Sequence, residues 1–292
     1  MRITTLFFIY LCVCLALAAW LTEPLLATGW IALEPHRVMG RLAQVMILLG
    51  IWPFLRSLSL ADRAALGYGV AKPVWRRAVA LGWLLGVMIL LVLTLALLAL
   101  DIRVPDWQAL SWLKIISKAF QALIGGMLVG VLEEIFFRGA LYSAIRRRDS
   151  IRAAAIWSAL LYALVHVMKP GALPAGMVFD ASGALWMFTH VFTNALDWQH
   201  LDSFTALFGV GILLALVREH TGHIGWCIGL HAGWVFVIQM TRHLTDAHDA
   251  APLSFLVGHY DGISGWLAAF WIGLLAVMYW WLIQRRQFAL GR

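Results

Sequence analysis

The chain has 292 residues, of which 62% are hydrophobic and 13% are charged, and its formal net charge is +7. A soluble globular protein carries about 25% charged residues. So few charges could not cover this much apolar surface in water, so the composition excludes a soluble domain and predicts a protein embedded in a lipid bilayer.

The positive net charge does not indicate nucleic-acid binding. Lys and Arg gather at the ends of the apolar segments, which is where cytoplasmic loops of membrane proteins carry them. We therefore expect lipid around most of the surface and no nucleic-acid partner.

Eight apolar segments approach the length of about 20 residues that a bilayer-spanning helix needs. They cover residues 3–21, 38–55, 78–100, 117–145, 153–168, 203–217, 224–240 and 263–283. The first could also be a cleaved signal peptide, although it is long for that role. A further apolar segment at 186–195 is short and contains several polar residues, so we expect a re-entrant or interfacial piece there.

The basic loops set the orientation of these segments. Most loop arginines lie in 56–77 and 146–152, and two more follow the last span at 285 and 286. The positive-inside rule assigns all of them to the cytoplasmic face, which requires an even number of spans. We predict an all-α, polytopic transmembrane helix bundle of about eight spans, with both termini inside. Its expected parts are N-terminal spans (1–110), a core (117–240) and an external loop with the last span (241–292).

Two adjacent carboxylates lie inside the fourth segment, where inserting each one costs about 2.5–3.5 kcal/mol. Glu134 and Arg138 are four residues apart, so on a helix they share a face and can pair. Glu133 points about 100° away and lacks this counter-ion. An unpaired carboxylate at this depth is typical of a general base, although a structural Glu–Arg cluster would give the same pattern.

Two histidines lie inside other segments, His166 in the fifth and His231 in the seventh. Counted from the nearest span ends at 1.5 Å per residue, Glu133 and His166 lie about 20 Å deep and His231 about 12 Å. Helix tilt can absorb the difference. Each histidine alone is compatible with a hydrogen-bonded core residue, but three titratable groups at similar depth could meet in one cavity.

These residues resemble the motifs of the CPBP family, which includes the CAAX proteases and bacteriocin-processing enzymes. The strings EEIFFRG at 133–139, YALVH at 162–166 and HAGWV at 231–235 are similar to its EExxxR, aromatic-to-His and HxxxN/D motifs. The resemblance covers roughly residues 117–240.

The resemblance implies a glutamic-type intramembrane endopeptidase that needs no metal or other cofactor. It assigns Glu133 as the base, His166 as its partner on the attacking water, and His231 as an oxyanion donor. It further implies that Glu134 and Arg138 hold this arrangement.

One position departs from the family pattern. Val235 stands four residues after His231, where the family has Asn or Asp, and valine cannot donate to an oxyanion. Losing one such donor costs about 10²–10³ in rate. We name Asn194 and Gln239 as possible replacements, since Asn194 lies in the expected re-entrant piece and Gln239 lies one turn beyond Val235 on the same helix face.

Two alternatives to a glutamic protease stay open at this point. Glu133, His166 and His231 would make a His₂Glu zinc set, although no HExxH string supports it. A non-catalytic membrane scaffold or immunity protein would need the Glu–Arg–His cluster only to hold helices together.

The expected partner is a membrane-anchored protein or peptide that enters the bilayer-embedded site. The resemblance is closer to the prokaryotic branch of the family, which implies a multi-pass protein of the plasma membrane.

Overall fold

The computed structural model describes residues 2–109, 111–258 and 260–289, which are helical almost throughout. The helices are α1 (Arg2–Ala27), α2 (Pro35–Ser57), α3 (Lys72–Ala99), α4 (Trp112–Glu134), α5 (Tyr142–Arg146), α6 (Ile151–Val167), α7 (Ala181–Ala195), α8 (Leu201–Thr221), α9 (Gly225–Leu244) and α10 (Trp266–Ala289). A π-helical segment, Ile135–Leu141, joins α4 to α5. Single 3-10 turns occupy Trp107–Ala109, Trp198–His200 and Ser254–Leu256.

Two short strands form the sheet found in the described residues. β1 (Arg103–Pro105) pairs antiparallel with β2 (Thr245–Ala247), with Arg103 opposite Ala247. The pair joins the connection between α3 and α4 to the segment that follows α9. It ties together the loops at one end of the bundle.

The predicted all-α membrane bundle is confirmed, but the count of eight spans is not exact. Within the described ranges, six helices are long and apolar enough to cross a bilayer. The two predicted spans that fall short are α6, which has 17 residues, and α9. Most of α9 is buried against other helices and it carries Gly and His, so it needs less apolar composition than a helix that faces lipid.

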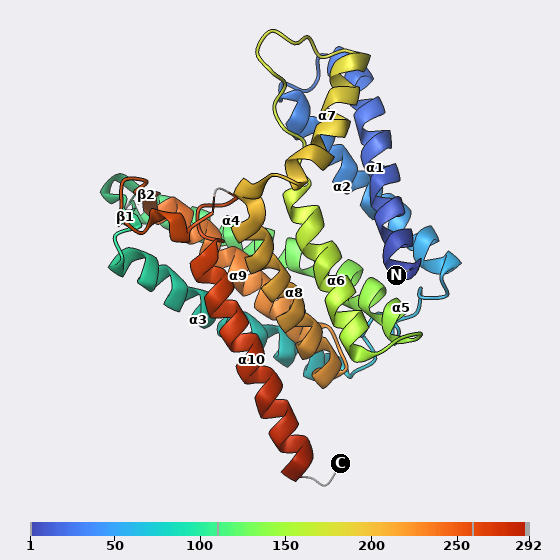
Figure 1. Cartoon of the computed structure of the whole chain (residues 1–292), viewed down its shortest axis with the longest axis vertical. Coiled ribbons are helices and arrows are strands. Elements are labelled where there is room, and N and C mark those ends of the chain that lie inside the picture. The colour runs from blue at the N-terminus through green and yellow to red at the C-terminus, as the bar shows by residue number, and fades with distance from the viewer. Residues whose placement is uncertain (1, 110, 259, 290–292) are drawn as a thin grey trace.

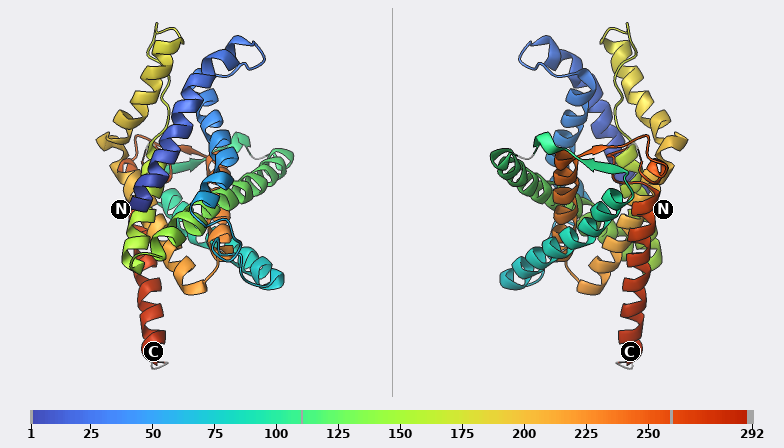
Figure 2. Two further views of the ribbon diagram at one scale, coloured as in Figure 1. Left: turned by 90° about the vertical axis from the view of Figure 1, so that its right-hand side faces the viewer. Right: turned by 90° about the vertical axis from the view of Figure 1, so that its left-hand side faces the viewer.

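The packing order differs from the chain order. α9 lies between α3 and α4, and α8 packs against both α6 and α10 (Figure 1). α3 and α4 project together from one side of the bundle (Figure 2). The central helix α9 is therefore enclosed by helices from both the first and second thirds of the chain.

Rows of small residues allow α9 to approach its neighbours closely, as their spacing predicts. A Cβ atom added to Gly82 of α3 would lie 2.8 Å from the carbonyl oxygen of Trp226. One added to Gly229 of α9 would collide with the carbonyl oxygen of Val79. On the other side, one added to Gly126 of α4 would lie 2.8 Å from the carbonyl oxygen of Ala232. Backbone packs against backbone on both faces of α9.

The segment predicted as re-entrant or interfacial belongs to a continuous helix, α7. It has 15 residues, which at 1.5 Å each give about 22 Å, less than the roughly 30 Å of a hydrocarbon core. α7 packs against α1 at the top of Figure 1, where Met187 is fully buried beside Ala18 and Met39.

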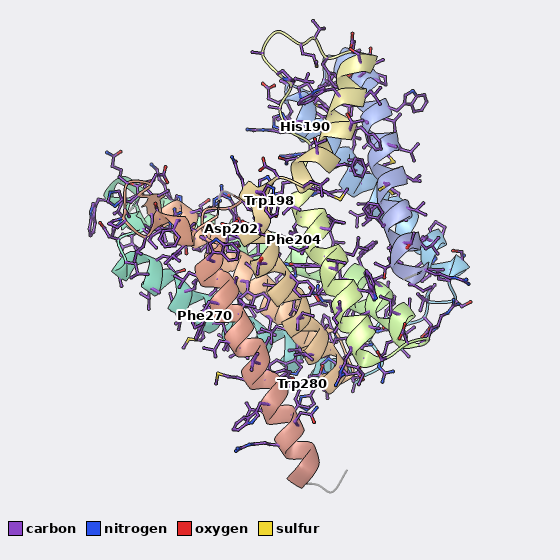
Figure 3. All side chains as sticks on the ribbon, in the orientation of Figure 1. His190, Trp198, Asp202, Phe204, Phe270 and Trp280 are labelled. Carbon is purple, nitrogen blue, oxygen red and sulfur yellow. The ribbon has the colours of Figure 1, made fainter. Side chains whose placement is uncertain are left out.

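Apolar side chains cover the outside of the bundle. Met88 on α3 and Leu128 on α4 are 61% and 58% exposed. On α10, Phe270 is 70% exposed and Trp280 lies further along the same helix (Figure 3). Such a surface is stable in lipid and not in water.

Candidate active site

Glu134 and Arg138 form a buried ion pair where α4 passes into the π-helical segment. Arg138 Nη1 donates to Glu134 Oε1 at 3.0 Å, and the two side chains are 1% and 0% exposed. Arg138 Nη2 also donates to the carbonyl oxygen of Gly211 on α8, and its guanidinium lies 4.5 Å from the centre of the Tyr162 ring. The pair expected from the four-residue spacing thus fastens α4 to α6 and α8.

The π-helical segment turns an unbroken run of side chains inward. All residues from Phe136 to Leu141 are buried, whereas a regular α-helix with a lipid-facing side would expose some of them. Turns of this type occur frequently at functional sites. Here the wide turn directly follows the two glutamates and seats Arg138 in the interior.

His231 of α9 is held by Glu134. Its Nδ1 lies 2.8 Å from Glu134 Oε1. Arg138 donates to the same oxygen, so this oxygen acts as an acceptor and the hydrogen of the bond belongs to His231 Nδ1. In neutral His231 the lone pair is therefore on Nε2, the nitrogen that points to Glu133.

His166 of α6 has the same tautomer for a different reason. Its Nδ1 lies 2.7 Å from the carbonyl oxygen of Tyr162. A carbonyl oxygen only accepts, so Nδ1 carries the hydrogen and Nε2 carries the lone pair of the neutral ring. Both histidines thus present Nε2 toward the interior of the site.

Glu133 lies between the two imidazoles. Its Oε2 is 3.4 Å from His166 Nε2 and 3.8 Å from His231 Nε2. That oxygen is buried and has no hydrogen-bond partner among the described residues. Three acceptor atoms therefore face one another at a separation that a proton or a small hydrogen-bonding molecule would bridge.

The cluster opens into a cavity of about 610 Å³. Glu133 and His166 lie in its wall, and most of the remaining wall is apolar and comes from α1, α2 and α4. Leu48 of α2 and Leu128 of α4 also line it and are 44% and 58% exposed. The cavity therefore reaches from the buried cluster to the outer surface between α2 and α4.

Two cavity residues near the cluster had no sequence signal. Lys169 follows α6, and Tyr260 belongs to the loop between α9 and α10. The Lys169 ammonium lies 3.6 Å from the centre of the Tyr260 ring. Burial lowers the pKa of Lys169, and burial together with the charge of Glu133 raises the pKa of Tyr260. No motif spacing marks either residue, and only their position in the fold brings them to the site.

The structure does not bring Asn194 or Gln239 to the cluster. Asn194 is near the end of α7, where its Oδ1 lies 3.3 Å from His200 Nε2. Gln239 faces Gly125 of α4, eight residues before Glu133, or about 12 Å along a helix. Neither residue lines the cavity.

The cluster does not form a recognisable metal centre. Across residues 2–109, 111–258 and 260–289, no group of three or more His, Cys, Asp or Glu side chains is arranged to hold a metal ion.

The arrangement of the cluster agrees with a comparison to known proteins. Residues 115–237 match the family model of the type II CAAX prenyl endopeptidase Rce1-like proteins. This segment of the chain, which carries the whole cluster, is thus similar to the CAAX protease (CPBP) family. No curated protein matches the chain, and no solved structure does.

The CAAX protease match contains every motif on which the sequence resemblance depends. Glu133, Glu134, Arg138, His166 and His231 all lie within residues 115–237. Together with the apolar helices, the match indicates an integral, multi-pass membrane protein with a segment similar to an endopeptidase family. Tyr260 lies outside the matched segment.

Proposed function

We propose that this protein is a glutamic-type intramembrane endopeptidase in which Glu133 and His166 activate a water molecule. The observation that carries the proposal is the position of Glu133 Oε2, which lacks a partner among the described residues and lies within 4 Å of both Nε2 atoms. A water molecule between these atoms would donate to the carboxylate and to one imidazole. Such groups contribute about 10²–10⁴ in rate as a general base.

The reaction is a hydrolysis in two steps. Glu133 takes a proton from the water as its oxygen bonds to the carbonyl carbon of the scissile peptide bond. The carbonyl oxygen then carries the negative charge of the tetrahedral intermediate. When the intermediate collapses, the C–N bond breaks, the proton held by Glu133 passes to the leaving nitrogen, and a carboxylic acid and an amine result.

The remaining residues of the cluster would position the base and stabilise charge. Glu134 and Arg138 fix the His231 ring through Nδ1. When His231 is protonated on both nitrogens, its Nε2–H can donate to the developing oxyanion. His231 would thus supply one hydrogen bond to the oxyanion.

The form of the cavity supports a membrane-anchored protein or peptide as the substrate. Its wall is mainly apolar and its opening lies between α2 and α4, both of which are long enough to span a membrane. A segment of a membrane-anchored protein or peptide could enter from the bilayer without crossing water. Like the prokaryotic branch of its family, the protein would act in a plasma membrane.

The test compares membranes that contain the wild type, Glu133→Gln or Glu23→Gln. Glu23 is an exposed carboxylate of α1 outside the cavity, so its replacement controls for the loss of one charge. Terminal-peptide mass spectrometry should find new protein termini with the wild type and Glu23→Gln, and none with Glu133→Gln. Identical termini in all three would refute the proposal and favour a structural role for the cluster.

A chelator separates the glutamic mechanism from the zinc alternative. Incubation with 1,10-phenanthroline should leave the appearance of termini unchanged. Loss of cleavage that returns on addition of Zn²⁺ would assign Glu133, His166 and His231 to a metal instead.

A further inference from the structure

The proposed hydrolysis leaves the developing oxyanion short of one hydrogen-bond donor. Val235 occupies the position from which the family pattern would supply an Asn or Asp, and valine has no polar atom. Asn194 and Gln239 lie outside the cavity lining. A donor must therefore come from another polar residue of the cavity wall.

Few polar side chains line the cavity besides Glu133 and His166. They are Cys12, Arg41, Gln44, Lys169 and Tyr260. The first three come from α1 and α2. Tyr260 is the one with a ring contact to the cluster, since the centres of the Tyr260 and His166 rings lie 6.3 Å apart.

The Tyr260 hydroxyl is available to a ligand. No hydrogen bond of this hydroxyl is found within the described part of the chain, and the residue is partly buried in the cavity wall. Burial and the charge of Glu133 raise its pKa. The hydroxyl therefore keeps its proton across the neutral range and can act only by donating or accepting a hydrogen bond.

The loop that carries Tyr260 is held by polar contacts on its far side. Asp261 Oδ1 accepts from the backbone N–H groups of Ile263 and Ser264 at 2.9 and 2.6 Å. Arg103 of β1 donates to the carbonyl oxygen of Gly262 at 3.0 Å. Lys169 fixes the ring itself from the cavity side. A donor that is oriented before the reaction loses no energy to reorganisation during it.

We propose that the Tyr260 hydroxyl donates a hydrogen bond to the oxyanion of the tetrahedral intermediate, in place of the side chain missing at Val235. The inference rests on the proposed proteolytic function and adds a catalytic residue to it. No bond to Tyr260 forms or breaks, and its proton stays on the phenol oxygen throughout. Lys169 is a positioning residue in this arrangement.

The test uses a synthetic peptide that spans a cleavage site made by the wild type, with purified protein in liposomes. Tyr260→Phe removes only the hydroxyl and keeps the ring that contacts Lys169. We expect kcat to fall about 10²–10³-fold, as on removal of an oxyanion donor elsewhere, with KM unchanged. Tyr68→Phe, a tyrosine outside the cavity lining, is the matched control and should keep full activity.

A second substitution tests whether an asparagine at position 235 can replace the hydroxyl of Tyr260 as the hydrogen-bond donor. Val235→Asn should restore much of kcat in the Tyr260→Phe protein and change the wild type little. Equal effects of Val235→Asn in both backgrounds would overturn the proposal. So would an unchanged kcat in Tyr260→Phe, or a loss confined to KM.

The outcomes remain separable from those of the proposed function. If Glu133→Gln is inactive while Tyr260→Phe is fully active, the protease assignment stands and the role of Tyr260 falls. If the wild type cleaves nothing, both fall together.

Discussion

Arg138 is the cation of the buried cluster, and its burial makes it contribute far more to the free energy of unfolding than an arginine at the surface does. Its side chain is 1% exposed and its charge is matched by Glu134. Removing one partner of a buried pair leaves the other charge uncompensated, which costs about 3–5 kcal/mol. We therefore expect Arg138→Met to lower the free energy of unfolding by that amount.

The control for this prediction is an arginine at the end of α5. Arg146 pairs with Glu219 at 3.2 Å but is 42% exposed, and exposed pairs contribute about 0–1 kcal/mol. Arg146→Met should therefore change stability little. The measurement is unfolding in mixed detergent micelles. A similar loss in both variants would show that burial of the Arg138 pair has no special weight.

The sequence identified the reactive residues, but it did not identify the residues that surround them. The two glutamates and two histidines were recognisable because ionisable groups are rare inside apolar segments, and in the structure each lies within 4 Å of at least one of the others. Tyr260 and Lys169 carried no such signal, because a loop residue reaches the site only through the path of the whole chain. Asn194 and Gln239 were chosen by their position along the sequence, which does not fix distance in space.

At the scale of elements, the contact between α3 and α9 sets the position of His231. Gly229 precedes His231 by two residues, and a Cβ atom there would collide with the carbonyl oxygen of Val79. Backbone cannot yield as a flexible side chain does, so Gly229→Ala should push the two helices apart. Overpacking of this kind costs about 1–3 kcal/mol, and the shift should also weaken the bond between His231 and Glu134.

The matched change is Gly273→Ala on α10, where an added Cβ atom would meet nothing within 4 Å. Stability in micelles and the rate of cleavage should both fall for Gly229→Ala and stay near wild type for Gly273→Ala. Equal behaviour of the two variants would mean that α3 and α9 tolerate a wider separation than their glycine rows indicate.

At the scale of the whole molecule, the number of helices was easier to predict than the number of crossings. Apolar runs of about 20 residues identified each long helix. Hydropathy alone cannot settle a helix such as α9, because burial against protein substitutes for contact with lipid. The same limit applies to α7, whose apolar residues pack on α1. Only the three-dimensional packing shows which apolar side chains meet protein.

The topology can be tested at the two helices that fall short of the apolar criterion, α6 and α9. If both cross, the α5–α6 connection lies on one face, and the α6–α7 and α9–α10 connections lie on the other. Figure 1 agrees with this arrangement, because the α5–α6 connection lies toward the bottom, with α7 and the strands toward the top. Single cysteines at the exposed positions Arg148, Ala175 and Asp249 report the three connections.

The labelling is done in sealed vesicles with a membrane-impermeant maleimide, after Cys12, Cys14 and Cys227 have been replaced by Ala. We expect Ala175→Cys and Asp249→Cys to react from the same side, and Arg148→Cys from the opposite side. Reaction of Arg148→Cys and Ala175→Cys from one side would mean that α6 does not cross. If α6 and α8 cross, labelling of Asp249→Cys from the same side as Arg148→Cys would mean that α9 re-enters. His231 would then reach Glu134 from a helix that never leaves the cytoplasmic side.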